Sequence, residues 1–167
     1  RIAYPGYSQF HRKKVVKEKS RLDHLVYVGQ LTPQKGIFNL VDHVKQFNAH
    51  GGNDKITLTI YTKYPNKDLI ADEAVSFRYN INHEQILTEL PKYDIAVFPS
   101  IWKEPFGFVM AEYVDAGLPI LTSGRGGSKE IYNDLDLTLY SPESYNSFVA
   151  GLRRIRGSGM RKLYNSS

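Results

Sequence analysis

Short apolar runs alternate with amphipathic stretches along most of this chain, and no other feature of the sequence limits its fold as much. The apolar runs are bounded by glycine, proline or polar residues, as buried strands usually are. In the longer stretches between them, apolar residues recur every three or four positions, which places them on one face of a helix. Strands that alternate with helices predict a parallel sheet with helices packed on both of its faces.

The expected fold class is therefore α/β, with a Rossmann-like, doubly wound parallel sheet of about six strands. The strands are predicted at residues 25–29, 56–61, 75–79, 95–98, 119–122 and, with a weaker pattern, 137–139. The helices are predicted at residues 36–48, 83–90 and 108–116 and from Ser141 onward, with Asn82 as a cap and Pro142 at a first helical position. Ligands of such sheets bind beyond the carboxyl ends of the strands, which directs attention to the loops at 29–36 and 99–108.

The composition fits one well-buried domain. With 41% hydrophobic and 23% charged residues over 167 positions, the chain is ordinary for a globular protein and short for two domains. No run approaches the ~18 apolar residues that a membrane-spanning helix needs. Cysteine is absent, which excludes disulfides, thiolate nucleophiles and cysteine-based zinc sites. This absence fits a reducing compartment, and we expect a cytoplasmic protein.

The net charge of +5 permits anionic partners, and the densest basic run is RKKVVKEKSR at residues 12–21. A solvated linker explains this run best, a peripheral contact with an anionic membrane is the alternative, and nucleic acid is less favoured. The aromatic spacing of a nucleic-acid module is missing, so no nucleic-acid partner is expected. The histidines form no close ligand pair, and Asp134 and Asp136 belong to a polar turn, so we predict no cofactor and no protein-bound metal.

Residues 94–130 carry most of the functional information. An apolar strand leads into the sequence EPFGFVMAE, in which Glu104 and Glu112 stand eight positions apart. A helix is predicted to begin inside this segment, and its first backbone N–H groups lack partners within the helix and favour an anion such as a phosphate. A carboxylate can accept hydrogen bonds from adjacent hydroxyl groups. Two carboxylates beside an anion site therefore predict a ligand with both a phosphate and several hydroxyls, as a nucleotide sugar has.

The ordered motifs of the chain resemble those of the retaining glycosyltransferases of family 4, which have the GT-B fold. The family pattern E-x-F-G-x-x-x-x-E stands here as EPFGFVMAE, after an apolar strand that ends in Pro-Ser, here DIAVFPS. The later pattern A-x-G-x-P is approximated by DAGLP at 115–119, which keeps Gly117 and Pro119 and has Ala116, and G-G-x-x-E is matched by GGSKE at 126–130. The similarity runs from about residue 24 to 156, most of the chain. It implies the nucleotide-sugar-binding, C-terminal half of a GT-B fold.

The resemblance also implies roles for individual residues. In the family the first glutamate contacts the transferred sugar and the second contacts the ribose of the nucleotide, which assigns these roles to Glu104 and Glu112. The pattern G-R-L-x-x-x-K-G, whose arginine and lysine hold the diphosphate, stands here as GQLTPQKG, with Lys35 retained and Gln30 in place of the arginine. The predicted catalytic residues are Glu104 and Lys35, and the predicted donor-binding residues are Gly29, Gln30, Lys35, Ile81, Glu104, Pro105, Phe106, Gly107, Phe108, Val109 and Glu112.

The chain departs from the family pattern at three places. Gln30 can donate one hydrogen bond but carries no charge, which predicts a weaker donor affinity or a charge supplied from elsewhere. The glycine-rich turn that often follows the second strand of the family is replaced by IYTKYPNK. Asn80 stands where a glycine is usual after the third strand, near the nucleobase pocket. Backbone groups around Ile81 can still meet the base, so the identity of the base stays open.

We therefore expect residues 1–21 to be a linker from a missing N-terminal domain and residues 22–167 to be the donor-binding domain. The implied activity is that of a retaining glycosyltransferase, of the hexosyltransferase type, that transfers a sugar to a glycan or glycolipid in bacterial polysaccharide biosynthesis. The acceptor would bind through the N-terminal domain, and this chain alone would transfer little or nothing. Gln30 and the altered turns favour one alternative, a non-catalytic subunit that stabilises a partner or binds acceptor. A sugar-nucleotide epimerase of similar architecture is another.

Overall fold

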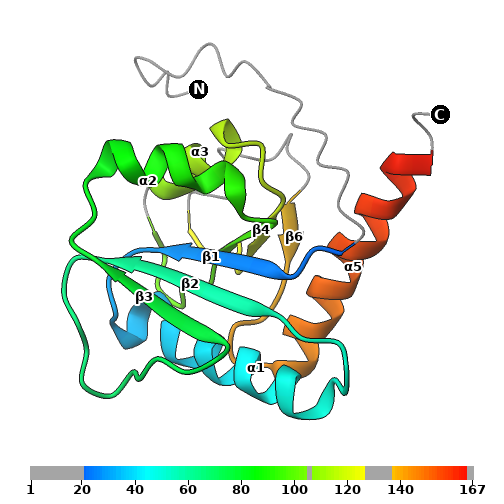
Figure 1. Ribbon diagram of the computed structural model, residues 1–167, viewed down its shortest axis with the longest axis horizontal. Helices are drawn as coiled ribbons and strands as arrows, with labels where there is room; N and C mark the ends of the chain where they lie inside the picture. The colour runs from blue at the N-terminus through cyan, green and yellow to red at the C-terminus, as the bar shows by residue number, and fades with distance from the viewer. Residues whose placement is uncertain (1–20, 105–106, 127–136, 165–167) are drawn as a thin grey trace.

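The computed structural model describes residues 21–104, 107–126 and 137–164, which form a six-stranded parallel sheet with helices on both faces (Figure 1). The strand order is β3-β2-β1-β4-β5-β6, and every neighbouring pair is parallel. The strands are β1 (His24–Val28), β2 (Thr57–Thr62), β3 (Val75–Tyr79), β4 (Ile95–Phe98), β5 (Ile120–Thr122) and β6 (Leu137–Leu139). The helices are α1 (Ile37–His50), α2 (His83–Glu89), α3 (Phe108–Asp115) and α5 (Tyr145–Tyr164), with two short 3-10 helices, η1 (Pro33–Lys35) and η2 (Leu90–Lys92). The predicted doubly wound α/β fold is confirmed.

Two apolar cores, one on each face of the sheet, follow from the pleat of the strands. Successive side chains of a strand point to opposite faces. On β1, Leu25 and Tyr27 pack with α1 and α5, whereas Val26 packs with α2 and α3 (Figure 1). Because both faces are covered at the centre of the sheet, β1 and β4 are apolar at nearly every position, whereas β2 and the edge strand β3 alternate with polar residues. No helix in the described part of the chain has the length and apolarity needed to cross a membrane.

The last helix begins later than predicted. Ser141 and Pro142 form a turn, in which the N–H of Ser144 donates to the carbonyl oxygen of Ser141 at 3.0 Å. Ser144 is the true cap, because its hydroxyl oxygen accepts the N–H of Ser147 at 3.2 Å and its carbonyl accepts the N–H of Phe148 at 3.0 Å. A serine that satisfies an early N–H of the helix is the favoured N-cap, and two serines three residues apart offered that signal.

The predicted cap of α2 is confirmed. The side chain of Asn82 accepts the backbone N–H of Gln85 at 3.0 Å. The helix ends at Glu89, one residue earlier than predicted, and the chain continues as the 3-10 turn η2. Pro91 lies in that turn and has no N–H with which to extend the helix.

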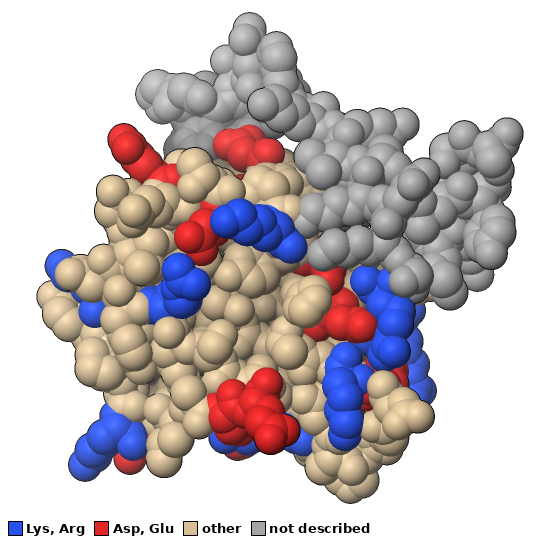
Figure 2. Space-filling view, viewed as in Figure 1, with Lys and Arg blue, Asp and Glu red and all other residues tan. Residues whose placement is uncertain are grey.

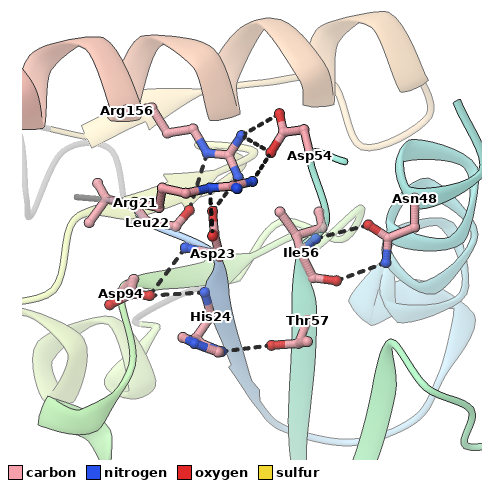
Figure 3. A network of polar contacts seen from close by, with 10 residues as sticks. All are labelled: Arg21, Leu22, Asp23, His24, Asn48, Asp54, Ile56, Thr57, Asp94 and Arg156. Carbon is pink, nitrogen blue, oxygen red and sulfur yellow. Dashed lines mark hydrogen bonds and ion pairs between the residues drawn. The ribbon is translucent and has the colours of Figure 1, made fainter. Parts of the chain in front are cut away.

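An ionic network ties together the amino ends of the strands, at the edge of the sheet opposite the predicted site (Figure 3). Arg156 of α5 donates to both carboxylate oxygens of Asp54 (2.9 and 3.1 Å) and to Asp23 (2.8 Å). Its Nε also donates to the carbonyl oxygen of Leu22 at 3.2 Å. Asp94, which is buried, accepts the backbone N–H of Asp23 at 3.1 Å. These contacts join the start of β1 to the start of β4 and to α5.

Candidate functional site

The carboxyl ends of β1 and β4 lie side by side at the centre of the sheet, and the chain leaves them toward opposite faces. After β1 it enters α1 on one face, and after β4 it enters α3 on the other. Where the strand order reverses in this way, α/β proteins form a crevice that binds ligands. The loops at residues 29–36 and 99–107, which follow β1 and β4, therefore form the candidate site.

Backbone contacts hold these two loops together. The carbonyl oxygen of Gln34 accepts the N–H groups of Ile101 (2.9 Å) and Trp102 (3.1 Å). Gly36 has a φ of +69°, and a Cβ at this position would lie 2.0 Å from the carbonyl oxygen of Pro99. Glycine alone combines this left-handed backbone with so close an approach. The glycine after Lys35 is therefore required by the contact between the loops.

Lys35 and Glu104, the two predicted catalytic residues, meet between the loops. Lys35 Nζ donates to Glu104 Oε1, and the two side chains form an ion pair. The Glu104 side chain is 14% exposed and the Lys35 side chain 31%, so the pair is partly open to solvent. The hydroxyl of Ser100 lies 3.3 Å from the same carboxylate oxygen. Because an ionised carboxylate has about four acceptor sites, Glu104 can hold Lys35 and still accept from a hydroxyl group of a ligand.

The backbone of Glu104 is fixed by the loop that follows β5. Glu104 and Gly126 form an isolated parallel β-bridge. Gly126 has a φ of +89°, and a Cβ there would lie 2.3 Å from the carbonyl oxygen of Glu104. The loop after β5 therefore approaches Glu104 as closely as only a glycine allows. The following residues of the GGSKE motif, including Glu130, lie outside the described residues.

Glu112 lies in the second turn of α3, separate from the Lys35–Glu104 pair. Its side chain is 20% exposed, and its Oε1 is 3.5 Å from His83 Nε2 at the start of α2. Burial raises the pKa of the Glu112 carboxyl; nearby His83 opposes this rise and Asp115 adds to it. A half-buried carboxylate among apolar neighbours is costly unless it finds hydrogen-bond donors. Glu112 is thus placed to accept from the hydroxyls of a ligand.

Tyr113 is a residue of the site that the sequence did not reveal. It is fully buried, and its hydroxyl oxygen accepts the backbone N–H of Val28, at the end of β1, at 2.8 Å. This contact ties α3 to the strand that leads into the loop at 29–36. A tyrosine in an apolar helix is typical of a core position, so no local signal distinguishes it.

Tyr27 was also missed, and it shapes the loop that carries Gln30. Its hydroxyl donates to the carbonyl oxygen of Gln30 at 2.8 Å. A Cβ on Gly29 would lie 2.6 Å from the Tyr27 hydroxyl oxygen, so the ring leaves no room for a side chain there. Burial, and then the negative charge of Glu104, raise the pKa of Tyr27 well above its ordinary value. The backbone of the loop is therefore fixed, while the side chain of Gln30 is exposed.

The other predicted donor-binding residues lie around the start of α3 and near α2. Gly107 has a φ of +55° and caps α3 without a side-chain hydrogen bond. Phe108 is 63% exposed, Val109 is half-buried, and Ile81 packs at the edge of the core that α2 and α3 cover. Pro105 and Phe106 lie outside the described residues, as do residues 1–20 of the predicted linker.

The departure at Asn80 has a structural reason. Asn80 has a φ of +51°, the only positive φ outside glycine among the described residues. Asparagine enters this left-handed region more readily than other side-chain-bearing residues, so it can stand where a glycine is usual.

No group of three or more metal-binding side chains occurs among the residues that the structure describes. Asp134 and Asp136, the pair that resembles a metal-binding motif, fall outside them. That the protein needs no metal stays a prediction.

The topology and the two loops define a class of protein: an α/β domain with a ligand site at the switch point of a doubly wound sheet. A sequence model of the family described as "Glycosyl transferases group 1" matches residues 8–162. The chain belongs to this family. Membership confirms the resemblance to GT-B glycosyltransferases that its motifs indicate.

Two relatives show how much of a longer protein the match covers. The glycogen synthase of Mycobacterium tuberculosis is 30% identical over 141 residues, which cover 78% of this chain and 33% of that protein. An uncharacterised glycosyltransferase of Methanocaldococcus jannaschii is 28% identical over 156 residues, or 87% of this chain and 38% of that protein. The chain thus spans about a third of the length of the curated relatives it matches.

Solved structures agree on the fold. The sucrose-phosphate synthase of Thermosynechococcus elongatus superposes with a TM-score of 0.67 at 23% identity, over 83% of this chain and 37% of that one. HepE of Anabaena, solved in complex with UDP-glucose, superposes with a TM-score of 0.65 at 19% identity, over 78% of this chain and 38% of that one. At these identities the likeness concerns the fold alone.

Proposed function

We propose that this chain is the donor-binding domain of a retaining glycosyltransferase that transfers a sugar from a nucleoside-diphosphate sugar to a glycan or glycolipid acceptor. The observation that carries the proposal is the ion pair of Lys35 and Glu104 at the crevice between β1 and β4. Family membership supports the transfer of a sugar. The UDP-glucose bound to HepE, a protein of the same fold, supports a nucleotide sugar as the donor.

The diphosphate of the donor would bind between Lys35 and the start of α3. Gly107 has no side chain with which to cap that helix start, and a helix N-terminus favours an anion through its dipole. Lys35 approaches from the loop after β1 and adds a positive charge. Fixed donors of this kind are most effective where charge develops during a reaction, which here is the departing phosphate.

The two glutamates would hold the two sugar rings of the donor. Glu104 pairs with Lys35, so a hydroxyl bound to Glu104 would belong to the transferred sugar next to the diphosphate. Glu112 lies in the second turn of α3, beside His83 of α2, where it would accept from the hydroxyls of the ribose. In this proposal Glu104 orients the sugar and does not act as a covalent nucleophile.

In the reaction that we propose, the bond between the anomeric carbon and the diphosphate breaks, and the acceptor hydroxyl attacks from the same face. The acceptor and the rest of the catalytic machinery would come from an N-terminal domain. This chain alone is then expected to bind the donor but to transfer little or nothing. We propose a cytoplasmic setting for the reaction, because nucleotide sugars are its substrates.

A calorimetric titration of this chain with UDP, GDP and ADP tests the proposal. Saturable binding of one nucleotide that weakens in a Glu112→Gln variant would support a donor site and would name the base. Glu73→Gln is the matched control, since Glu73 is exposed and precedes β3 at the opposite edge of the sheet. Failure of all three nucleotides to bind to the folded protein would contradict the proposal and favour a non-catalytic subunit.

A further inference from the structure

The proposed diphosphate site contains little net positive charge from its own two loops. The charge of Lys35 is opposed by Glu104, and Gln30 has no charge to add. Glu104 takes part in a β-bridge, and successive side chains of extended chain point to opposite sides. Such an alternation would direct Lys103, which is exposed, away from the pair. A strongly anionic diphosphate in this crevice thus needs a cation from a neighbouring segment.

Arg125, in the loop after β5, is already engaged. Its guanidinium pairs with Glu143 through contacts of 2.7 and 2.8 Å. It also donates to the carbonyl oxygen of Ile101 at 3.2 Å. This bidentate pair offsets the charge of Arg125, which therefore supports the loop after β4.

The loop between β2 and β3 brings a further lysine to the same edge of the sheet. Val28 of β1 pairs with Tyr61 of β2, so the segments that carry Gln30 and Lys63 leave the sheet from neighbouring strands, each residue two positions beyond this pair. Neighbouring strands are about 4.8 Å apart, so the two segments start side by side where the strands end. The two segments stay together beyond that point, because Asn66 Nδ2 donates to the carbonyl oxygen of Leu31 at 3.0 Å.

Lys63 is exposed and can reach a ligand. Within the described part of the chain its ammonium group forms no ion pair and lies over the ring of its neighbour Tyr64, 5.3 Å from the centroid. A cation–π contact with an exposed ring is weak and can yield to a phosphate. In the space-filling view, basic side chains lie at the left end of the molecule, over the carboxyl ends of β1 and β2 (Figure 2).

We propose that Lys63 contacts the diphosphate of the donor and supplies the positive charge that Gln30 lacks. The inference rests on the proposed function and adds a specific residue to it. It also gives a role to the IYTKYPNK sequence, which runs from the end of β2 into the following loop: this loop carries Lys63, and Asn66 holds it against the segment after β1.

Titration of Lys63→Gln with the nucleoside diphosphate that the wild-type chain binds, and with the matching nucleoside, tests the inference. Because a charge-assisted hydrogen bond is lost, the affinity for the diphosphate is expected to fall about tenfold or more, while the affinity for the nucleoside stays unchanged. The dependence of the diphosphate affinity on salt should also become weaker. Lys55→Gln is the matched control, because Lys55 lies just before β2 and Lys63 just after it. Its affinities should equal those of the wild type.

A second variant asks whether the two positions share one role. Adding Gln30→Arg to Lys63→Gln places a cation on the adjacent strand end and should restore most of the lost affinity. The inference would be overturned if Lys63→Gln bound the diphosphate as tightly as the wild type. It would also be overturned if Lys67→Gln lost affinity and Lys63→Gln did not. Either result would leave the proposed function intact. Absence of any nucleotide binding by the wild-type chain would overturn both.

Discussion

The hydroxyl oxygen of Tyr113 in α3 accepts the backbone N–H of Val28 at the end of β1, at 2.8 Å. Tyr113 directly follows Glu112, and Val28 directly precedes Gly29. One hydrogen bond therefore sets the distance between the glutamate proposed to hold the ribose and the loop that carries Lys35. The two halves of the candidate site are joined through the core as well as through their loops.

Tyr113→Phe tests this link. The substitution keeps the ring but removes the acceptor, so the N–H of Val28 is left without its partner. The free energy of unfolding, measured in urea, should fall by ~1–3 kcal/mol, the usual effect of an unpaired buried polar group. Tyr64→Phe is the control, since Tyr64 is 67% exposed, and it should change stability by no more than ~0.5 kcal/mol. Equal changes in the two variants would show that the Tyr113 contact contributes nothing.

Gly36→Ala separates backbone strain from steric clash when it is compared with Gly52→Ala. Both glycines have a left-handed φ, +69° and +56°, so alanine is strained at either position by ~1–2 kcal/mol. A Cβ on Gly52 meets nothing within 4 Å, whereas one on Gly36 would lie 2.0 Å from the carbonyl oxygen of Pro99. Thermal unfolding should therefore show a clearly larger loss for Gly36→Ala. Equal losses of stability in the two variants would mean that the close approach of Gly36 to Pro99 does not contribute to folding.

The burial of His43 predicts how the free energy of unfolding depends on pH. It is buried against Tyr145 and Phe148, and its Nδ1 has no hydrogen-bond partner among the described residues. Burial lowers the pKa of His43 below its ordinary value of 6.5, although Asp42 partly opposes the shift. In mild acid His43 is therefore protonated in the unfolded chain but stays neutral in the folded chain. Its contribution to the free energy of unfolding is fully present above about pH 6.5 and is lost as the pH drops toward the pKa of the folded state.

Urea titrations of wild type, His43→Leu and His50→Gln at about pH 8 and about pH 5 measure this effect. His50 is exposed at the end of α1, so His50→Gln should keep the pH dependence of the wild type. His43→Leu should lose less stability between about pH 8 and about pH 5 than the wild type or His50→Gln. The same loss in all three proteins would assign the pH dependence to other groups.

Glu112 predicts a pH dependence of nucleotide binding. Burial is the main cause that raises the pKa of its carboxyl, and only the ionised form accepts hydrogen bonds with both oxygens. The affinity should therefore be full above that raised pKa and should decline as the pH falls through it. Kd measured against pH for wild type and Glu112→Gln should show a decline that is absent from the variant. Parallel profiles would remove Glu112 from the ribose contact.

Much of the fold follows from local patterns in the sequence. The central strands β1 and β4 are apolar on both faces and the helices on one, and the alternation of strands with helices predicts a doubly wound sheet with its site beyond the carboxyl ends of the strands. Lys35 and Glu104 were singled out by the family resemblance, and the topology places both of their loops at that end of the sheet. Only the structure shows that the two side chains form an ion pair.

Other contacts could not be predicted, since they depend on distant partners. Tyr113 and Tyr27 look like ordinary core residues, and only the three-dimensional structure shows which backbone groups their hydroxyls reach. The bond from Asn66 to Leu31 joins residues 35 positions apart in a loop with no regular pattern. The predicted start of α5 is wrong because Ser141 and Ser144 both offer a cap, and in the structure Ser144 accepts the first N–H groups of the helix.

The most direct test of the central claim is to compare the affinities of this chain for a nucleotide sugar and for the matching nucleoside diphosphate, in wild type and in Glu104→Gln. UDP-glucose with UDP, GDP-mannose with GDP and ADP-glucose with ADP serve as probe pairs. In the wild type, one nucleotide sugar should bind more tightly than its diphosphate. Glu104→Gln should remove this preference while diphosphate binding survives, because Lys35 is released from its partner. An unchanged preference in the variant, or no binding of any pair to the wild type, would contradict the central claim.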